Sequence, residues 1–313
     1  MRKLNRREFI GAVAGLGAAI LAGGCKSEAT EKAAAAGGGV ARAPRFDSRE
    51  LAVASGKDPA KLTRAAVEAL GGMDKLVKKG DFVVVKPNIA WNRPPDAAAT
   101  TNPHVVAEIV RMCREAGAGR VLVLDHIIDR PAEMVLGFTG IREAAEGAGA
   151  EVASAQNESD YRSVALPKGK VMKSDTCNKD VLKADVFINV PIAKSHSATT
   201  LTLGMKNLMG CNWDRQAWHQ GASLDQCIAD YASAVRPDLT VLDANRILLT
   251  NGPKGPGDTR DVGQVVAGVD VVAVDAYGAT LFGLKPEEIG HIRLAAELGV
   301  GEMDLTELSI KTV

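Results

Sequence analysis

The stretch Phe82-Val83-Val84-Val85-Lys86-Pro87-Asn88 decides the fold, because four apolar residues lead directly into a polar tripeptide. Three further segments repeat the pattern: residues 121–124 precede Asp125-His126, residues 186–188 precede Asn189, and residues 239–242 precede Asp243. Apolar runs that are continuous rather than alternating predict strands buried on both faces, as in a parallel sheet.

Helical patterns lie between these runs. Val105, Val106, Ile109, Val110 and Cys113 are spaced for one helix face, and Gly117 ends the pattern. Similar patterns span residues 62–70, 224–235 and 289–298. Strands that alternate with helices predict a doubly wound α/β fold, a mainly parallel sheet flanked by helices. The less regular stretches near 150–180 and 197–221 are expected to be long loops or an inserted lobe.

The N-terminus predicts export by the twin-arginine pathway. Arg6-Arg7-Glu8-Phe9-Ile10 leads into an apolar run that ends at Gly24. This run is shorter than the roughly 20 apolar residues that a bilayer span needs, so we interpret residues 1–24 as a signal peptide. Residues 25–45 are rich in Ala, Gly, Glu and Lys without an apolar period, which predicts a flexible linker. Residues 46–313 are then expected to form one α/β domain in the periplasm or cell envelope.

Two cleavage sites compete at the end of the signal. Leu21-Ala22-Gly23-Gly24-Cys25 resembles a lipoprotein signal, in which Cys25 would carry the lipid, although Ala22 stands where Leu is preferred. The alanines at 33–36 instead suit ordinary signal peptidase. We therefore expect the protein to contact the membrane only through its signal peptide or a lipid anchor.

The charge balance disfavours nucleic acid as a partner. The chain has 38 basic and 38 acidic side chains, and removal of residues 1–24 takes away four basic and one acidic, which leaves 34 against 37. A slightly acidic mature protein lacks the basic face that nucleic-acid binding requires.

Polar residues at the strand ends predict a binding site. Ligands of doubly wound sheets bind beyond the carboxyl ends of the strands, where Lys86, Asn88, Asp125 and Asp243 are expected. Asp and Asn also cap ordinary turns at such places. Because four strand ends share the feature and lead into charged or His-bearing loops, the site is the favoured interpretation.

The densest polar segment runs from Asn189 to Cys211 and includes Lys194-Ser-His196 and Lys206-Asn207-Leu-Met-Gly210. Lysine supplies positive charge, and histidine can donate, accept or ligate near neutral pH. These residues suit an anionic ligand such as a carboxylate, a phosphate or a metal-bound cofactor. The plainer alternative is a Ser/Thr-rich helix start with solvated lysines.

These motifs resemble the domain of unknown function 362 family over residues 82–283. The resemblance rests on Lys86-Pro-Asn88, the segment from Lys194 to Gly210, His219 and the stretches around Asp243, Gly252 and Asp275. Members often carry a ferredoxin segment that binds 4Fe-4S clusters, so the resemblance implies a redox or metal-cofactor association. This sequence has no C-x-x-C-x-x-C run, and hence no ferredoxin module.

The cysteines leave the metal question open. Cys113 and Cys227 lie on apolar helix faces and are expected in the core. Cys177 and Cys211 lie near polar loops, and each could be a metal ligand, half of a disulfide or a plain thiol. Their spacing alone does not distinguish these possibilities.

Three functions are therefore considered. The first is an exported protein with a redox or metal-cofactor role. The second is an acid–base enzyme for a small anion, in which Lys86, Lys194 and Lys206 hold the anion while His196 and His219 move a proton. In this second function, Asp243 or Asp125 would orient one imidazole, and isomerisation or racemisation beside a carbonyl is the expected chemistry. The third is a periplasmic binding module for a small anion, without turnover.

The remaining polar features are less specific. His104 and His291 fall in helix patterns and are expected to be structural, whereas the role of His126 stays open. Trp213-Asp-Arg-Gln-Ala-Trp-His219 could form a lid, or its tryptophans could simply pack locally. The glycines of residues 251–258 could cradle an anion, but the segment matches neither the P-loop nor the dinucleotide fingerprint.

Overall fold

A computed structural model describes residues 48–221 and 223–313. The predicted signal peptide, Cys25 and the linker up to residue 45 lie outside the described residues. The described residues belong to one compact unit. No helix within the described part of the chain is both long and apolar enough to cross a bilayer.

The main sheet is mostly parallel, as the sequence predicts. Its path runs β12-β1-β11-β10-β7-β2-β3-β4, and β8 and β9 extend it beside β10. The parallel centre consists of β10, β7, β2, β3 and β4, and antiparallel pairing is confined to β1–β11, β10–β11 and β8–β9. The strands of this sheet are β1 (Glu50–Ser55), β2 (Phe82–Pro87), β3 (Arg120–Asp125), β4 (Glu151–Ser154), β7 (Val186–Val190), β8 (Ile192–His196), β9 (Thr200–Thr202), β10 (Leu239–Leu248), β11 (Thr259–Gly268) and β12 (Ser309–Thr312).

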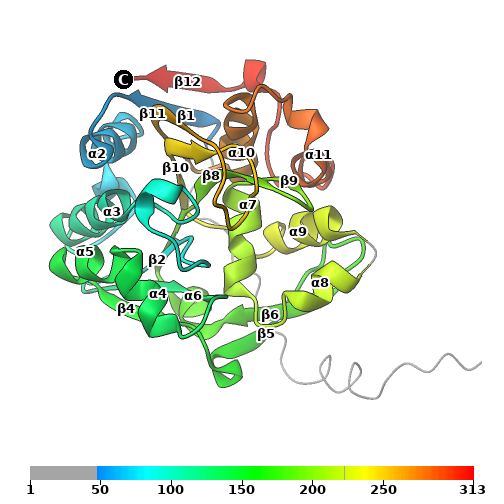
Figure 1. Cartoon of the computed structure of the whole chain (residues 1–313), viewed down its shortest axis with the longest axis horizontal. Helices are drawn as coiled ribbons and strands as arrows, with labels where there is room; N and C mark the ends of the chain where they lie inside the picture. Colours follow the sequence, from blue (N-terminus) through cyan, green and yellow to red (C-terminus); the bar gives the residue numbers. More distant parts are fainter. Residues whose placement is uncertain (1–47, 222) are drawn as a thin grey trace, which may run out of the picture. The chain divides into compact units, whose positions relative to one another are not determined.

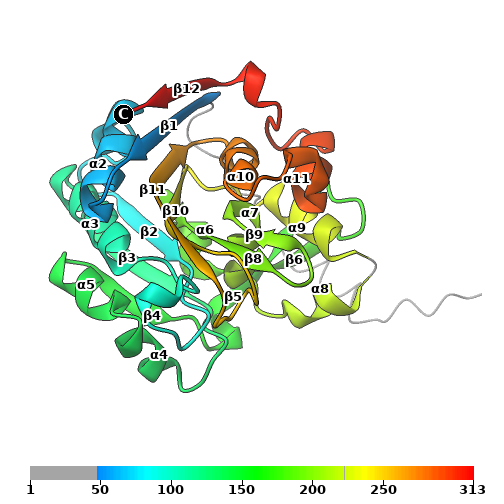
Figure 2. The same ribbon diagram turned by 45° about the horizontal axis from the view of Figure 1, so that its top comes forward.

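Helices cover both faces of this sheet (Figures 1 and 2). One face carries α2 (Pro59–Ala69), α3 (Pro103–Glu115), α4 (Ala132–Phe138) and α5 (Ile141–Gly147). The other carries α7 (Gly204–Asn207), α9 (Leu224–Ala232), α10 (Val271–Thr280) and α11 (Gly290–Glu297). Two further short helices are α6 (Lys179–Lys183) and α8 (Gln216–Gln220).

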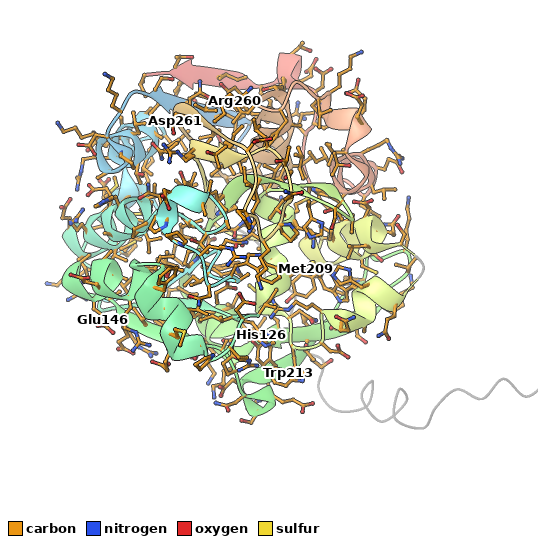
Figure 3. The ribbon with its side chains drawn as sticks, in the orientation of Figure 1. His126, Glu146, Met209, Trp213, Arg260 and Asp261 are labelled. Atoms are coloured by element: carbon orange, nitrogen blue, oxygen red, sulfur yellow. The ribbon has the colours of Figure 1, made fainter. Side chains whose placement is uncertain are left out.

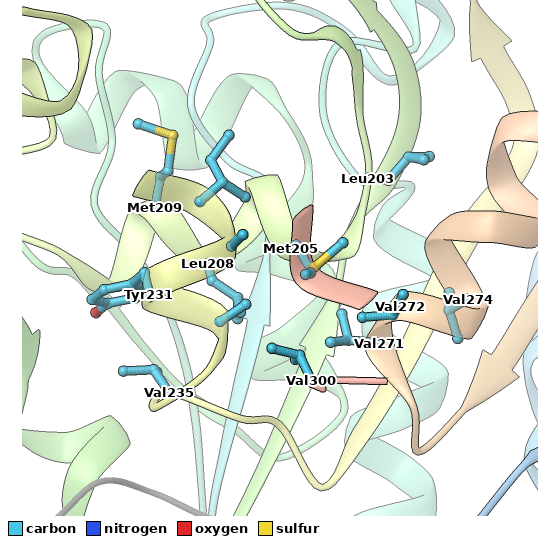
Figure 4. Close-up of a cluster of buried hydrophobic side chains, with 14 of the residues drawn as sticks. Leu203, Met205, Leu208, Met209, Tyr231, Val235, Val271, Val272, Val274 and Val300 are labelled. Atoms are coloured by element: carbon cyan, nitrogen blue, oxygen red, sulfur yellow. The ribbon is translucent and has the colours of Figure 1, made fainter. Parts of the chain in front are cut away.

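Successive residues of the central strands point into the two different cores. In β2, Val83 and Val85 pack with α2 and α3, whereas Val84 packs on the opposite face. This alternation explains why the strands are apolar throughout, since each face meets a helical layer. Figure 4 shows the second core, where Leu203, Met205 and Leu208 pack against Val271 and Val272 of α10.

The two stretches expected to be irregular carry regular elements. β4 joins the main sheet, and β5 (Tyr161–Ala165) and β6 (Ser174–Asn178) form a separate two-stranded antiparallel sheet. Between 197 and 221 lie β9, α7, the 3₁₀ turn Leu208–Cys211 and α8. These elements are short, which is why no periodicity revealed them.

Candidate functional site

The carboxyl ends of the parallel strands open into one cavity of about 580 Å³. Lys86 ends β2, Asp125 ends β3, and Lys194 lies on β8, so three strands deliver polar side chains to the same edge of the sheet. The remaining wall comes from the segments 88–91, 126–130, 196–202 and 206–219 and from Pro253. A cavity of this size accommodates a small molecule.

Eight of the nine residues predicted from sequence for catalysis or ligand binding line this cavity. They are Lys86, Asn88, Lys194, His196, Lys206, Asn207, Gly210 and His219. Asp243 does not line it. Its carboxylate accepts hydrogen bonds from Asn102 N at 2.7 Å and from Asn245 N and Nδ2, so its contacts organise the start of α3 and the bend in β10 rather than an imidazole.

Lys86 is held in a closed network. Its Nζ lies 2.8 Å from Asp125 Oδ1 and also donates to Pro87 O and to Asn207 Oδ1. Asp125 is the aspartate that the sequence offered as the alternative partner for a histidine, and here its Oδ1 faces Lys86 while its Oδ2 accepts from Ile89 N. Because both charges are buried, their pairing fixes the ends of β2 and β3 together.

Three asparagines connect this pair to its neighbours. Asn207 accepts from Asn88 Nδ2 at 3.0 Å and donates to Asn189 Oδ1 at 2.9 Å. Asn88 Oδ1 accepts from Lys194 Nζ at 3.1 Å, and Lys194 donates a second bond to Ala99 O at 2.5 Å. The asparagines therefore act as orienting groups that satisfy the buried lysines of adjacent strands.

Gly210 allows the backbone to approach the ion pair. A Cβ at this position would lie 2.0 Å from Asp125 Oδ1 and 2.6 Å from Lys86 Cε, so no other residue fits without breaking the network. Gly252 is required for a different reason: a Cβ there would lie 1.8 Å from Ser195 O. Gly252 thus serves the packing of the 251–258 loop on β8, and Pro253 is the residue of that loop on the cavity wall.

Lys206 has far fewer partners than Lys86. Among the described residues, its Nζ has a single hydrogen-bond acceptor, the thioether Sδ of Met209 at 3.0 Å, a weak one. Burial, and then the nearby Arg215, lower the pKa of Lys206 to about 8. Burial lowers the pKa of Lys194 to about 7. Both amines therefore exchange protons near neutral pH.

His196 is neutral and fixed as one tautomer. Its Nδ1 accepts a hydrogen bond from Ala198 N at 3.0 Å, so the proton of the neutral ring is on Nε2. Burial, with Lys206 and Lys194 nearby, lowers the pKa of His196 to about 3. At neutral pH, His196 is consequently a hydrogen-bond donor rather than a base.

His126, which sequence left undecided, is part of the site. Its ring stacks on Trp213 with a centroid distance of 5.1 Å and an angle of 4° between planes, and both residues are labelled in Figure 3. Nδ1 donates to Asn212 O at 3.1 Å, which leaves Nε2 of the neutral ring as an acceptor. Burial, followed by Arg215, lowers the pKa of His126.

Arg215 and Thr202 are the functional candidates that sequence reasoning missed as ligands. Arg215 donates to His126 O at 2.8 Å and lines the cavity. Thr202 faces Lys194 across the β8–β9 hairpin, and its buried hydroxyl is among the described side chains that have no hydrogen-bond partner. Sequence reasoning missed Arg215 because its loop has no periodicity. It missed Thr202 because only the register of the β8–β9 hairpin places that residue opposite Lys194.

The cysteines lie away from the cavity wall. Cys113, Cys177, Cys211 and Cys227 are all buried and reduced, and the last three belong to the same core. Within residues 48–221 and 223–313, no three His, Cys, Asp or Glu side chains gather as a metal site. A 4Fe-4S cluster needs four thiolates at one place, and Cys113 belongs to the core on the other face of the sheet, so the described cysteines do not fit one. The metal assignment of Cys177 and Cys211 stays a prediction.

The helical histidines have the structural surroundings expected of them. His104 is exposed in the first turn of α3. His291 is buried in α11, with Nδ1 3.1 Å from Asp225 Oδ1.

The chain is similar to a known protein family and to a relative from Synechocystis sp.. The model of the family described as Domain of unknown function (DUF362) matches residues 83–280. A thylakoid-associated protein of Synechocystis sp. is 34% identical over 250 residues, which cover 76% of this chain and 74% of that protein.

Two solved structures are similar at low sequence identity. The lactate racemase apoprotein from Thermoanaerobacterium thermosaccharolyticum is 13% identical with a TM-score of 0.48, over 77% of this chain and 61% of that chain. A Thermotoga maritima protein is 12% identical with a TM-score of 0.39, over 78% of this chain and 60% of that chain.

Proposed function

The chain belongs to the DUF362 family, and we propose that it is an enzyme that binds a small anionic substrate at the strand ends and performs acid–base chemistry on it. The observation that carries the proposal is the charge of the cavity lining. Lys86, Lys194, Lys206, Arg130 and Arg215 line it, and the buried carboxylate among its lining residues, Asp125, already faces Lys86. Lys206, Arg130 and Arg215 are the cations of this lining that an anion can reach.

The site also holds groups of complementary proton-transfer type. The Nε2 of His126 is an acceptor, whereas the Nε2 of His196 is a donor. Burial, with Lys206 nearby, lowers the pKa of His219, which favours its neutral, basic form. A base beside a fixed neutral donor can remove a proton next to a carboxylate and stabilise the charge that develops on its oxygen.

The expected chemistry is proton abstraction from a carbon beside a carboxylate or carbonyl group, as in isomerisation or racemisation. The base is His126 or His219, His196 donates to the developing oxyanion, and Arg215 with Lys206 holds the anion. Export by the twin-arginine pathway, a redox association and the cluster implied by the family resemblance remain predictions outside this proposal.

The test separates binding from turnover. Calorimetry measures the binding of 2-hydroxy and 2-oxo acids, and proton NMR in D₂O measures exchange of the C2 hydrogen of the hydroxy acids and of the C3 hydrogens of the oxo acids. Binding accompanied by exchange supports the enzyme, and exchange should fall in His126→Phe or His219→Phe variants. Binding without exchange would identify a small-anion binding module, and no binding of any acid in the panel would refute the proposal.

A further inference from the structure

The three lysines of the cavity differ in whether their nitrogen can react. Lys86 is paired with Asp125, and Lys194 donates to two carbonyl-type oxygens, Ala99 O and Asn88 Oδ1, while remaining only 1% exposed. Lys206 has the Met209 sulfur as its acceptor and is 8% exposed, at the cavity wall. Lys206 is therefore the amine that a bound molecule can reach.

The surroundings of Lys206 keep its positive charge poorly compensated. Arg215 faces it from the 213–221 segment, and the nearest acid, Asp225 on α9, is 3.1 Å from His291 Nδ1. His196 and His219 also act on the same region, and both are disfavoured as cations by Lys206. Burial and a neighbouring cation are the two conditions that convert lysine into a nucleophile at neutral pH.

The neighbours supply what carbonyl chemistry needs. The Thr202 hydroxyl is buried and without a partner among the described residues, and Thr202 lines the cavity at the end of β9, four residues before Lys206 in sequence. His196 presents a neutral Nε2 donor. A carbonyl oxygen can accept from these groups while the guanidinium of Arg215 receives a carboxylate.

From this arrangement we propose that Lys206 forms an imine with a 2-oxo acid, whose carboxylate is bound by Arg215. This inference rests on the proposed function, because it names the substrate class of the same site. The neutral amine attacks the carbonyl carbon, and one of its protons passes to the carbonyl oxygen to give a carbinolamine. The second nitrogen proton then leaves with that hydroxyl as water. The resulting C=N bond forms without oxidant or reductant, and it acidifies the hydrogens on the adjacent carbon.

The experiment traps this bond. Full-length protein is incubated separately with glyoxylate, pyruvate and 2-oxoglutarate, reduced with sodium cyanoborohydride, and analysed by intact mass and peptide mapping. The expected result is one secondary-amine adduct on Lys206, which the wild-type peptide map identifies without any variant. Lys206→Arg keeps the charge, should still bind the acid in calorimetry, and should lose the adduct. Lys57→Arg, at an exposed turn, should label as wild type.

The outcomes separate the two proposals. Binding of an oxo acid without an adduct, or an adduct on Lys194 or surface lysines only, overturns the imine and leaves the anion site standing. An adduct that persists in Lys206→Arg also overturns it. Neither binding nor labelling by any of the three acids overturns the imine, and the proposed function falls with it if the 2-hydroxy acids also fail to bind.

Discussion

The two sides of the cavity differ in whether the charge of a buried lysine is neutralised by a carboxylate. On the paired side, Lys86, Asp125, Asn207 and Gly210 form a closed network in which every charge has a partner. On the open side, Lys206 has a sulfur for a partner and a second cation for a neighbour. Buried charges that are paired hold a structure together, whereas buried charges left unpaired lower stability and await a ligand. The paired side thus holds the strand ends in place, and the open side is available to bind a ligand.

The largest expected effect comes from breaking the paired side. Asp125→Ala leaves the Lys86 ammonium buried without its carboxylate, so the free energy of unfolding should fall by about 3–5 kcal/mol. Urea unfolding followed by circular dichroism measures the loss. Glu146→Ala, on the exposed surface of α5, is the matched control and should change it by less than about 0.5 kcal/mol. A loss below about 1 kcal/mol in Asp125→Ala would show that the pair does not hold the strands.

The open side should respond with the opposite sign. Lys206→Met removes a buried charge whose pKa is about 8 in the folded protein, below the ordinary lysine value. Stability at pH 7 should therefore stay unchanged or rise by up to about 2 kcal/mol. Binding of pyruvate should weaken by roughly tenfold to a hundredfold, as expected for loss of a charge-assisted contact. Urea unfolding tests the stability of Lys206→Met, and calorimetry on the same preparation tests its binding of pyruvate. A variant that is less stable but binds pyruvate as well as the wild type would show that Lys206 stabilises the fold and does not bind the ligand.

The pH dependence distinguishes two roles of Lys206, non-covalent binding of an anion by its charged form and imine formation by its neutral form. A lysine with a lowered pKa in the folded state is least favourable when charged, so wild-type stability should rise as the pH increases through about 8 toward the ordinary lysine pKa. Over the same range, non-covalent binding of lactate should weaken because positive charge is lost. The rate of imine trapping should increase because neutral amine accumulates. Parallel rather than opposed profiles would contradict the dual role of Lys206.

The smallest effect separates the two nitrogens of His196. Asparagine places an amide oxygen near the position of Nδ1, so His196→Asn can keep the contact with Ala198 N while it removes the Nε2 donor. Glutamine reaches the position of Nε2, so His196→Gln should retain that donor. We expect Asn to weaken lactate binding by about 1 kcal/mol and Gln by less. Calorimetry on the two variants gives the answer, and equal affinities would exclude the Nε2 donor as a ligand contact.

The sequence predicts the framework of this molecule and most of its site. Continuous apolar runs identified β2, β3, β7 and β10, and the rule that strand ends converge brought Lys86, Asn88 and Asp125 together. Asp243 follows the same pattern but caps local backbone, since strand-end position does not encode where a carboxylate points. Tautomers and pairing are likewise invisible in sequence, because they depend on neighbours such as Ala198 and Asp125 that folding supplies.

The stacked rings of His126 and Trp213 make the cavity observable by light. Trp213 and Trp91 line it, whereas Trp218 is 2% exposed and donates through Nε1 to Asp175. An indole against an imidazole loses fluorescence when the imidazole gains a proton or shifts, so occupancy of the cavity should change the emission of the chain. Trp213→Phe would assign the signal, and the protein then carries its own indicator for screening unknown anions.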